Sequence, residues 1–142
     1  MRIDLCNLTA KHIMGWELLE INYYGTPEAT PRQVELHDWI DEMEINAVGL
    51  YWIDVEKDFW INASGYSGWF PTMKLGQAWQ ILGKFPNTEY VIDITRRNDD
   101  LWSVRVADRK TRETAWYADE KIEIAICMAA LAAKGVDIAK ES

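Results

Sequence analysis

The side chains with the most chemistry to offer are tryptophans, of which the chain carries eight in 142 residues. Indole is large, is seldom fully buried, and has an N–H group that needs a partner. A domain of this size does not need eight such rings to fill its interior. We therefore expect some of them to line a cleft or an interface, where they would stack on a planar ligand or pack against a partner.

Several of these rings lie near the expected start of a helix at Thr72, with Lys74 in its first turn. Helix starts attract anions through their N–H groups and the helix dipole. A base stacked on the aromatic rings would gain about 1–3 kcal/mol, while its phosphate would meet the amides. The predicted ligand-binding residues are Trp52, Trp60, Tyr66, Trp69, Thr72, Lys74 and Arg96. In the plainer alternative, these rings form a hydrophobic core beside a capped helix, and Trp79 and Trp102 belong to that core as well.

The residue types that perform nucleophilic or metal chemistry are sparse. A nucleophile needs a histidine and an orienting acid beside it, but His12 is expected to be a partly buried ring on an apolar helix face. Cys127 lies in an alanine-rich segment and is interpreted as packing. His37 and Asp41 are four residues apart, which suits two metal ligands on one helix face, yet no third ligand is apparent. We therefore expect that the protein is not an enzyme and that it binds no metal ion and no cofactor.

The formal net charge of −8 argues against non-specific binding to duplex nucleic acid. From Glu28 to Asp58 nine acids accompany two bases, whereas six bases and five acids lie between Thr88 and Arg112. The second segment leaves room for a small anion, although ordinary variation in surface charge explains the same pattern. No apolar run reaches the ~20 residues that cross a bilayer, and no signal peptide is apparent. We expect a cytoplasmic protein with no membrane partner.

The apolar periodicity predicts helices separated by antiparallel strand pairs. We therefore expect one α+β domain over residues 1–142, a layered α/β/α sandwich with a mainly antiparallel sheet of about five strands. In an alternative for the first segment, Gly15 ends the helix and a strand follows over 16–24. The expected helices span 4–19, 31–46, 72–85 and 119–134, and the expected strands span 48–55, 59–63, 89–96, 101–108 and 113–116.

The helix over 31–46 begins with Thr30 and Pro31, a hydroxyl cap followed by proline at the first helical position. Its apolar face includes Leu36, Trp39 and Met43, and acids cover much of the opposite face. The apolar face either covers the sheet or protrudes as an interface for a partner protein.

Several local patterns occur in an order that resembles the phage ABA sandwich domain family of small phage and prophage proteins. They are Met14-Gly15-Trp16, Trp69-Phe70-Pro71-Thr72 followed by Ala78-Trp79, Trp102-Ser103-Val104, and the closing run 125–131. Thr72 stands where serine is usual, which keeps the capping hydroxyl. The resemblance spans nearly everything except about 24–47, which is interpreted as a helical insertion. It implies a sheet with helices on its faces and a phage origin, and it implies no activity or catalytic residues.

Phage ancestry and surplus aromatic residues lead us to expect a non-enzymatic phage accessory protein in the host bacterial cytosol. Its expected role is anti-defence: it would bind and sequester a small nucleotide-type immune signal. Tight binding usually calls for an enclosed pocket, and pockets shared between subunits are one way to form it, so we expect a homo-oligomer. In the alternative, the acidic helix over 31–46 docks on a host protein and blocks it. An enzyme acting on a nucleotide or sugar is the third hypothesis.

Overall fold

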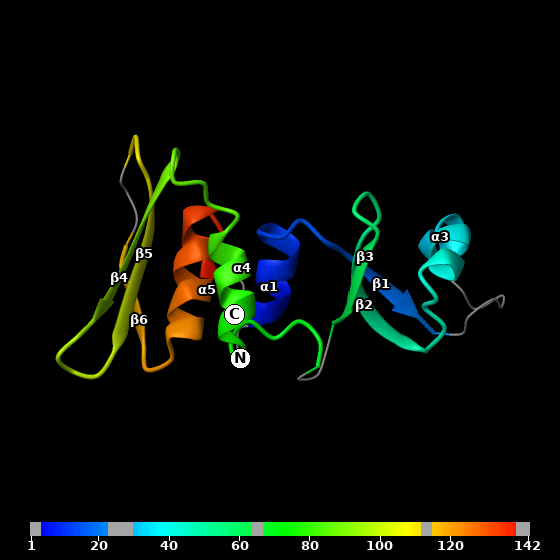
Figure 1. Ribbon diagram of the computed structural model, residues 1–142, viewed down its shortest axis with the longest axis horizontal. Coiled ribbons are helices and arrows are strands. Elements are labelled where there is room, and N and C mark those ends of the chain that lie inside the picture. Colours follow the sequence, from blue (N-terminus) through cyan, green and yellow to red (C-terminus); the bar gives the residue numbers. More distant parts are fainter. Residues whose placement is uncertain (1–3, 23–29, 64–66, 112–114, 139–142) are drawn as a thin grey trace. The chain divides into compact units, whose positions relative to one another are not determined.

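A computed structural model describes residues 4–22, 30–63, 67–111 and 115–138, which form five α-helices and six strands (Figure 1). The chain divides into two compact units, and each is described by itself. We call residues 15–69 the central unit, and residues 1–14 with 70–142 the terminal unit. The expected α+β class is confirmed. The strands, however, form two three-stranded antiparallel sheets rather than one sheet of about five.

In the central unit the sheet has the strand order β1–β2–β3. Its strands are β1 (Glu17–Ile21), β2 (Gly49–Asp54) and β3 (Phe59–Asn62). The presence of β1 confirms the alternative in which the first helix stops before Gly15, whose φ is +72°. The hairpin of β2 and β3 was also predicted.

The expected helix over 31–46 is two shorter helices, α2 (Pro31–Glu35) and α3 (His37–Glu42). The predicted start is confirmed, because Thr30 and Gln33 form a capping box in which each side chain accepts the other's backbone N–H. The helix breaks at Leu36, where ψ is 5°. This break lets Leu36 enter the core beside the sheet.

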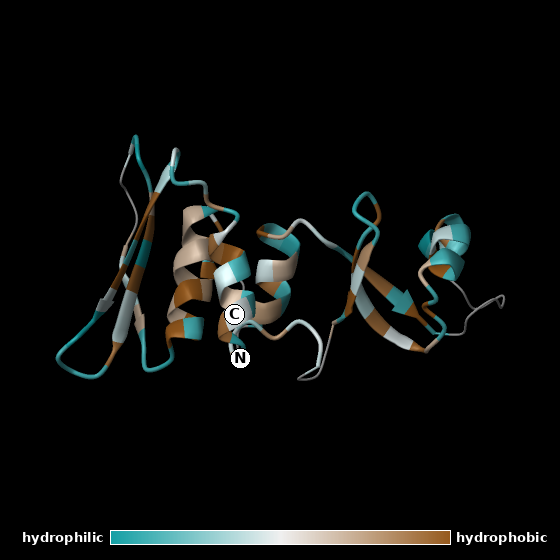
Figure 2. Ribbon diagram, in the orientation of Figure 1, coloured by the Kyte–Doolittle hydropathy of each residue, from teal (hydrophilic) through white to brown (hydrophobic). Residues whose placement is uncertain are grey.

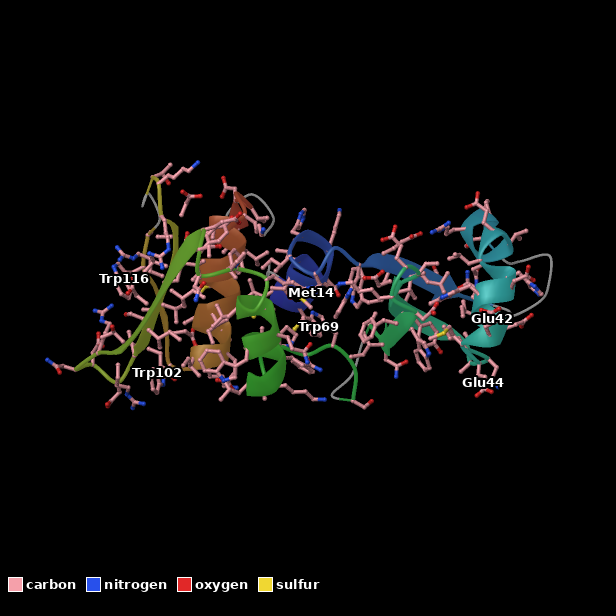
Figure 3. The ribbon with its side chains drawn as sticks, turned by 45° about the horizontal axis from the view of Figure 1, so that its top comes forward. Met14, Glu42, Glu44, Trp69, Trp102 and Trp116 are labelled. Atoms are coloured by element: carbon pink, nitrogen blue, oxygen red, sulfur yellow. The ribbon has the colours of Figure 1, made fainter. Side chains whose placement is uncertain are left out.

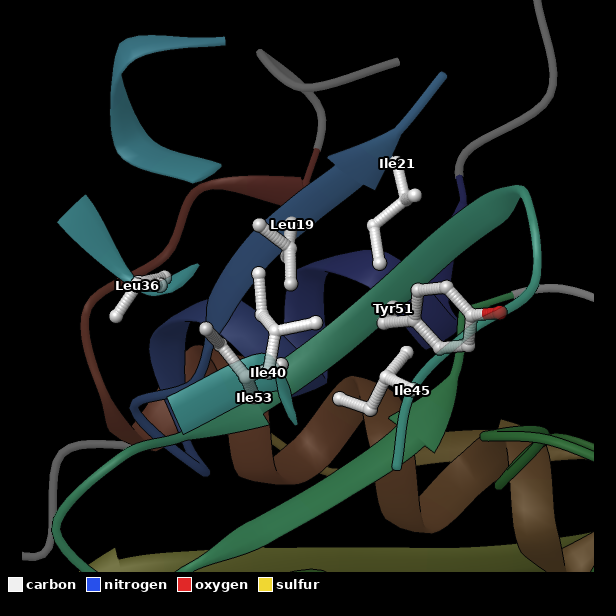
Figure 4. Packing of buried hydrophobic residues seen from close by; sticks show 7 residues of the cluster. All are labelled: Leu19, Ile21, Leu36, Ile40, Ile45, Tyr51 and Ile53. Atoms are coloured by element: carbon white, nitrogen blue, oxygen red, sulfur yellow. The ribbon is translucent and has the colours of Figure 1, made fainter. Parts of the chain in front are cut away.

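Helices α2 and α3 cover one face of the central sheet. Figure 4 shows the residues of this core, which are Leu19, Ile21, Leu36, Ile40, Ile45, Tyr51 and Ile53. Trp39, Met43 and Trp60 pack against them. Of the two expectations for the apolar helix face, covering the sheet is confirmed. The predicted protrusion of Leu36 as a partner-binding residue is wrong, because its side chain is buried.

In the terminal unit α5 packs against β5 and β6, while α1 and α4 pack against α5. The helices are α1 (Leu5–His12), α4 (Leu75–Leu82) and α5 (Ile122–Ala133), and the strands are β4 (Tyr90–Arg96), β5 (Trp102–Asp108) and β6 (Tyr117–Asp119). Figure 2 shows α5 as mostly apolar along its length, as a helix with neighbours on several sides must be.

The end of α5, the start of β6 and the position of His12 can be compared with the sequence-based predictions. Gly135 has a φ of +78° and closes α5 with the two backbone hydrogen bonds of a Schellman motif, as its place after the basic residue Lys134 predicts. Of the expected strand over 113–116, residues 113 and 114 lie outside the described residues, and residues 115 and 116 precede β6, which begins at Tyr117. His12 is exposed at the end of α1, so its predicted burial is wrong.

Candidate functional site

The strongest candidate for a ligand site is the face of the central unit's sheet that lies opposite α2 and α3. Cross-strand pairing places Leu18, Trp52 and Ile61 side by side. Because side chains alternate across a strand, these residues point away from the core residue Ile53. The same alternation places Phe59, opposite Asp54, on this face.

Aromatic rings gather around this row. The ring centroid of Trp16 lies 4.9 Å from that of Phe59 and 4.7 Å from that of Trp69, the second pair meeting edge to face. The backbone N–H of Trp69, a residue labelled in Figure 3, donates to the carbonyl oxygen of Asn62 at 3.0 Å. We call Trp16, Leu18, Trp52, Phe59, Ile61 and Trp69 together the aromatic face.

Trp52 holds the most unusual polar group of this face. Its side chain is 4% exposed, and its Nε1–H has no hydrogen-bond partner among the described residues. An unpaired buried donor costs about 1–3 kcal/mol. Trp39 shows the ordinary arrangement, since its Nε1–H donates to Asp58 Oδ1 at 3.0 Å. Trp52 therefore offers a desolvated donor that a hydrogen-bond acceptor would stabilise.

The surroundings of Trp52 are apolar at the centre and acidic at the ends. Leu18 and Leu50, which share its face, remain about half exposed. Glu20 lies opposite Leu50 at one end, and Asp54 lies at the other. This face consequently suits an uncharged heterocycle better than a phosphate group.

The structure separates Trp60 from the other predicted ligand residues of the central unit. Trp60 pairs with Ile53, so it points to the opposite face of the sheet from Trp52. It packs on the core and meets Tyr51 edge to face, with ring centroids 5.5 Å apart. The expected grouping of Trp52 and Trp60 on one platform is therefore wrong. Tyr66 lies outside the described residues.

The predicted anion site at Thr72 does not have the expected geometry. Helix α4 begins at Leu75 with Lys74 at its N-cap position, and no side chain caps it. The hydroxyl of Thr72 lies 3.3 Å from the thiol sulfur of Cys6 instead. Thr72, Lys74 and Arg96 belong to the terminal unit, whereas the predicted tryptophan residues belong to the central unit.

Arg96 lies at the end of the hairpin that joins β4 and β5. Its guanidinium stacks over the ring of Trp102, 5.0 Å from the centroid. Arg96, Arg97, Asn98 and Asp99 line an open depression there. Arg96 also pairs with Asp100 at 3.6 Å, and Arg97 pairs with Asp99 at 3.1 Å. The charges cancel within the loop, so an anion gains little there.

Of the other residues that could perform chemistry, Cys127 is buried in packing and His37 pairs with an acid on the surface. Burial in α5 raises the pKa of the Cys127 thiol well above its ordinary value, which keeps this cysteine protonated and unreactive. His37 Nδ1 lies 3.5 Å from Asp41 Oδ2 on the surface of α3. In the part of the chain that the structure describes, no three histidine, cysteine or acidic residues are grouped as metal ligands would be.

Sequence reasoning missed Trp16, Leu18, Phe59 and Ile61 as members of the aromatic face. Trp16 and Leu18 were assigned to a helix, in which their spacing of two residues places them on different faces. The alternative strand over 16–24 supplies the signal, because residues two apart in a strand share a face. Phe59 required the register of the hairpin.

The chain is thus an α+β protein in which, among the described residues, one buried side-chain N–H on the aromatic face lacks a partner. Comparison with protein families identifies the family of this chain. A family model, the phage ABA sandwich domain, matches residues 7–131, so the chain belongs to that family. The matched range includes residues of both units. The comparisons found no matching curated protein and no matching solved structure. None of the helices in the described segments has the length and apolar character of a membrane span.

Proposed function

We propose that this family member is a non-enzymatic phage accessory protein that binds a small nucleotide-type ligand on the aromatic face of its central unit. The observation that supports the proposal most is the buried, unpaired Nε1–H of Trp52. A ring nitrogen or carbonyl of a nucleobase is an acceptor of the right kind. Pairing with it would remove a cost that the unliganded protein bears.

The aromatic neighbours supply the second part of recognition. A base beside the partly exposed ring of Trp16 gains stacking energy of about 1–3 kcal/mol. Glu20 and Asp54 repel phosphate, so the ligand binds through its heterocycle and directs its phosphates towards solvent. This arrangement differs from our expectation for Thr72, in which the phosphate was the anchor.

In an infected bacterium such binding would sequester a nucleotide signal of immunity, which is the anti-defence role that we propose. Sequestration needs affinity and slow release but no turnover. Because a pocket shared between subunits encloses a ligand on more sides, we also propose that the protein binds as a homo-oligomer in the host cytosol. Sedimentation of the liganded protein tests this, and a monomer at saturation would contradict it.

Calorimetry with a panel of cyclic dinucleotides and ADP-ribose derivatives tests the ligand proposal. At micromolar protein we expect heat with at least one ligand. Trp52→Phe removes the N–H group and keeps an aromatic ring, and we expect it to weaken binding about tenfold or more, as the loss of a buried hydrogen bond predicts.

Trp60→Phe is the matched control, since it makes the same change on the opposite face of the same sheet. It should leave the affinity unchanged, although it removes packing from the core. Equal effects of the two substitutions would refute the assignment to the aromatic face. The absence of heat with every ligand of the panel would refute the nucleotide class altogether.

A further inference from the structure

Helix α4 carries apolar side chains on two sides. Ala78, Ile81 and Leu82 are buried within the terminal unit. Leu75 and Trp79, which are one turn apart, are 42% and 47% exposed, and Met73 just before the helix is 43% exposed. Trp79 was expected in the core, so the sequence pattern misassigned it. We call Met73, Leu75 and Trp79 the α4 patch.

The centre of this patch carries no charge, whereas three lysines adjoin it in the sequence or in space, and we call them its lysine rim. From Leu75 to Gly83 the helix contains no charged residue, and Lys74 and Lys84 stand directly before and after this segment. The ammonium group of Lys121 lies 3.2 Å from the sulfur of Met73. The patch thus has positively charged neighbours although the whole chain has a net charge of −8.

Beside the patch, Gly76 has no side chain to cover the helix backbone. A Cβ atom added at Gly76 would meet nothing within 4 Å, so a partner can approach the helix backbone between Leu75 and Trp79. An apolar centre that contains tryptophan, surrounded by a polar rim, is the arrangement of protein–protein interfaces. Exposed apolar patches with polar rims commonly mark interaction sites.

We infer that the α4 patch is a docking surface for a segment of another protein that carries apolar residues flanked by acidic ones. The lysine rim selects acidic flanks through complementary charge. A second copy bound symmetrically would bring one lysine rim against the other, which charge repulsion disfavours. The inference is independent of the ligand proposed for the aromatic face, which lies in the other unit.

Fluorescence anisotropy with a synthetic probe tests the inference. The probe is a fluorescein-labelled amphipathic peptide with two leucines four residues apart and glutamates on either side. A second peptide has lysine in place of each glutamate. We expect the first peptide to bind the full chain, to bind less tightly at high salt, and to bind more tightly than the second peptide.

Two tryptophan substitutions locate the binding surface. Trp79→Ser should weaken binding of the first peptide about tenfold or more, as expected for a central interface tryptophan. Trp116→Ser is the control, because Trp116 is 46% exposed in the same unit and lies over Arg105 instead. It should leave binding unchanged. Thermal unfolding of both variants checks that each is folded.

A charge reversal tests the acidic class of the partner. In the double variant Lys84→Glu, Lys121→Glu we expect the preference to pass to the lysine peptide. The inference is overturned if the two peptides bind the unaltered chain alike, if neither binds, or if Trp79→Ser has no effect. It is also overturned if sedimentation shows self-association that Trp79→Ser abolishes, since the patch would then hold a second copy.

Discussion

Gly68 allows its own backbone to lie close to the end of β3, and replacing it should be costly. An added Cβ at residue 68 would collide with the carbonyl oxygen of Asn62 and stand 2.9 Å from its carbonyl carbon. Backbone atoms cannot rotate away as a flexible side chain can. The substitution Gly68→Ala must therefore displace the loop that carries Trp69.

The expected loss has two parts. Overpacking costs about 1–3 kcal/mol, and weakening the hydrogen bond from the N–H of Trp69 to the carbonyl oxygen of Asn62 costs about 0.5–1.5 kcal/mol. Alanine also lowers the conformational entropy of the unfolded chain, which stabilises the folded state by about 0.4–1 kcal/mol and offsets part of this loss. We therefore expect Gly68→Ala to lower the free energy of unfolding by about 1–3 kcal/mol, or roughly 5–10 °C in Tm for the middle of this range.

Gly76→Ala is the matched control in α4. Its new methyl group would enter open space, and alanine is the better helix former by up to about 1 kcal/mol. We expect this variant to be as stable as the unaltered chain or slightly more so. Urea unfolding followed by tryptophan fluorescence and circular dichroism measures both variants. If Gly68→Ala were neutral or stabilising, the close approach of the loop to β3 would be wrong.

Three further predictions concern local interactions. Thr30→Ala removes the capping box with Gln33 and should cost about 1 kcal/mol in urea unfolding, whereas Thr30→Ser should cost little; equal losses would contradict the cap. Gly135→Ala forces a side chain into a φ of +78° and should cost about 1–2 kcal/mol, and an unchanged urea midpoint would contradict this. Cys127, whose pKa is raised by burial, stays protonated in the folded chain while the unfolded thiol ionises above about pH 8.5. Stability should therefore decline as the pH rises beyond that value, and this decline should be smaller in Cys127→Ala; identical pH profiles would refute it.

The sequence predicted local elements well where local signals specify them. The start at Thr30, the hairpin of β2 and β3, and the glycine that closes α5 all depend on residues that are near one another in the chain. The failures concern register and long-range contacts. The expected strands over 48–55 and 59–63 leave three residues, 56–58, for the turn, whereas Val55 and Asp58 close a turn of four residues. One additional residue reverses the face on which Trp60 lies relative to Trp52.

Contacts between distant residues explain the other differences. Thr72 had the residue type of an N-cap, but its hydroxyl meets Cys6, which is 66 positions earlier. The side chain of Gln77 instead accepts the backbone N–H of Phe70 at 2.6 Å in front of α4. Helical spacing alone cannot tell which of two apolar faces becomes buried, so Trp79 was assigned to the core.

The position of Leu36 and Ile40 in the core also changes how the segment over 31–46 can be tested. A deletion of this segment would remove both core side chains together with α2 and α3, and the central unit would lose its buried centre. Surface substitutions are the better test of docking by this region. Glu42 and Glu44, exposed and labelled in Figure 3, are suitable positions. Loss of host-protein binding after their replacement by glutamine would support the acidic-helix alternative.

The most direct test of ligand binding on the aromatic face is the indole N–H resonance of Trp52 in a ¹⁵N-labelled sample, assigned by its absence from Trp52→Phe. During titration with the nucleotide panel, we predict that this resonance moves downfield as the ligand accepts a hydrogen bond from Nε1–H. The indole resonance of Trp60 should stay in place. A Trp52 resonance that remains unmoved at saturation, or a panel that perturbs no indole resonance at all, would contradict the proposed site.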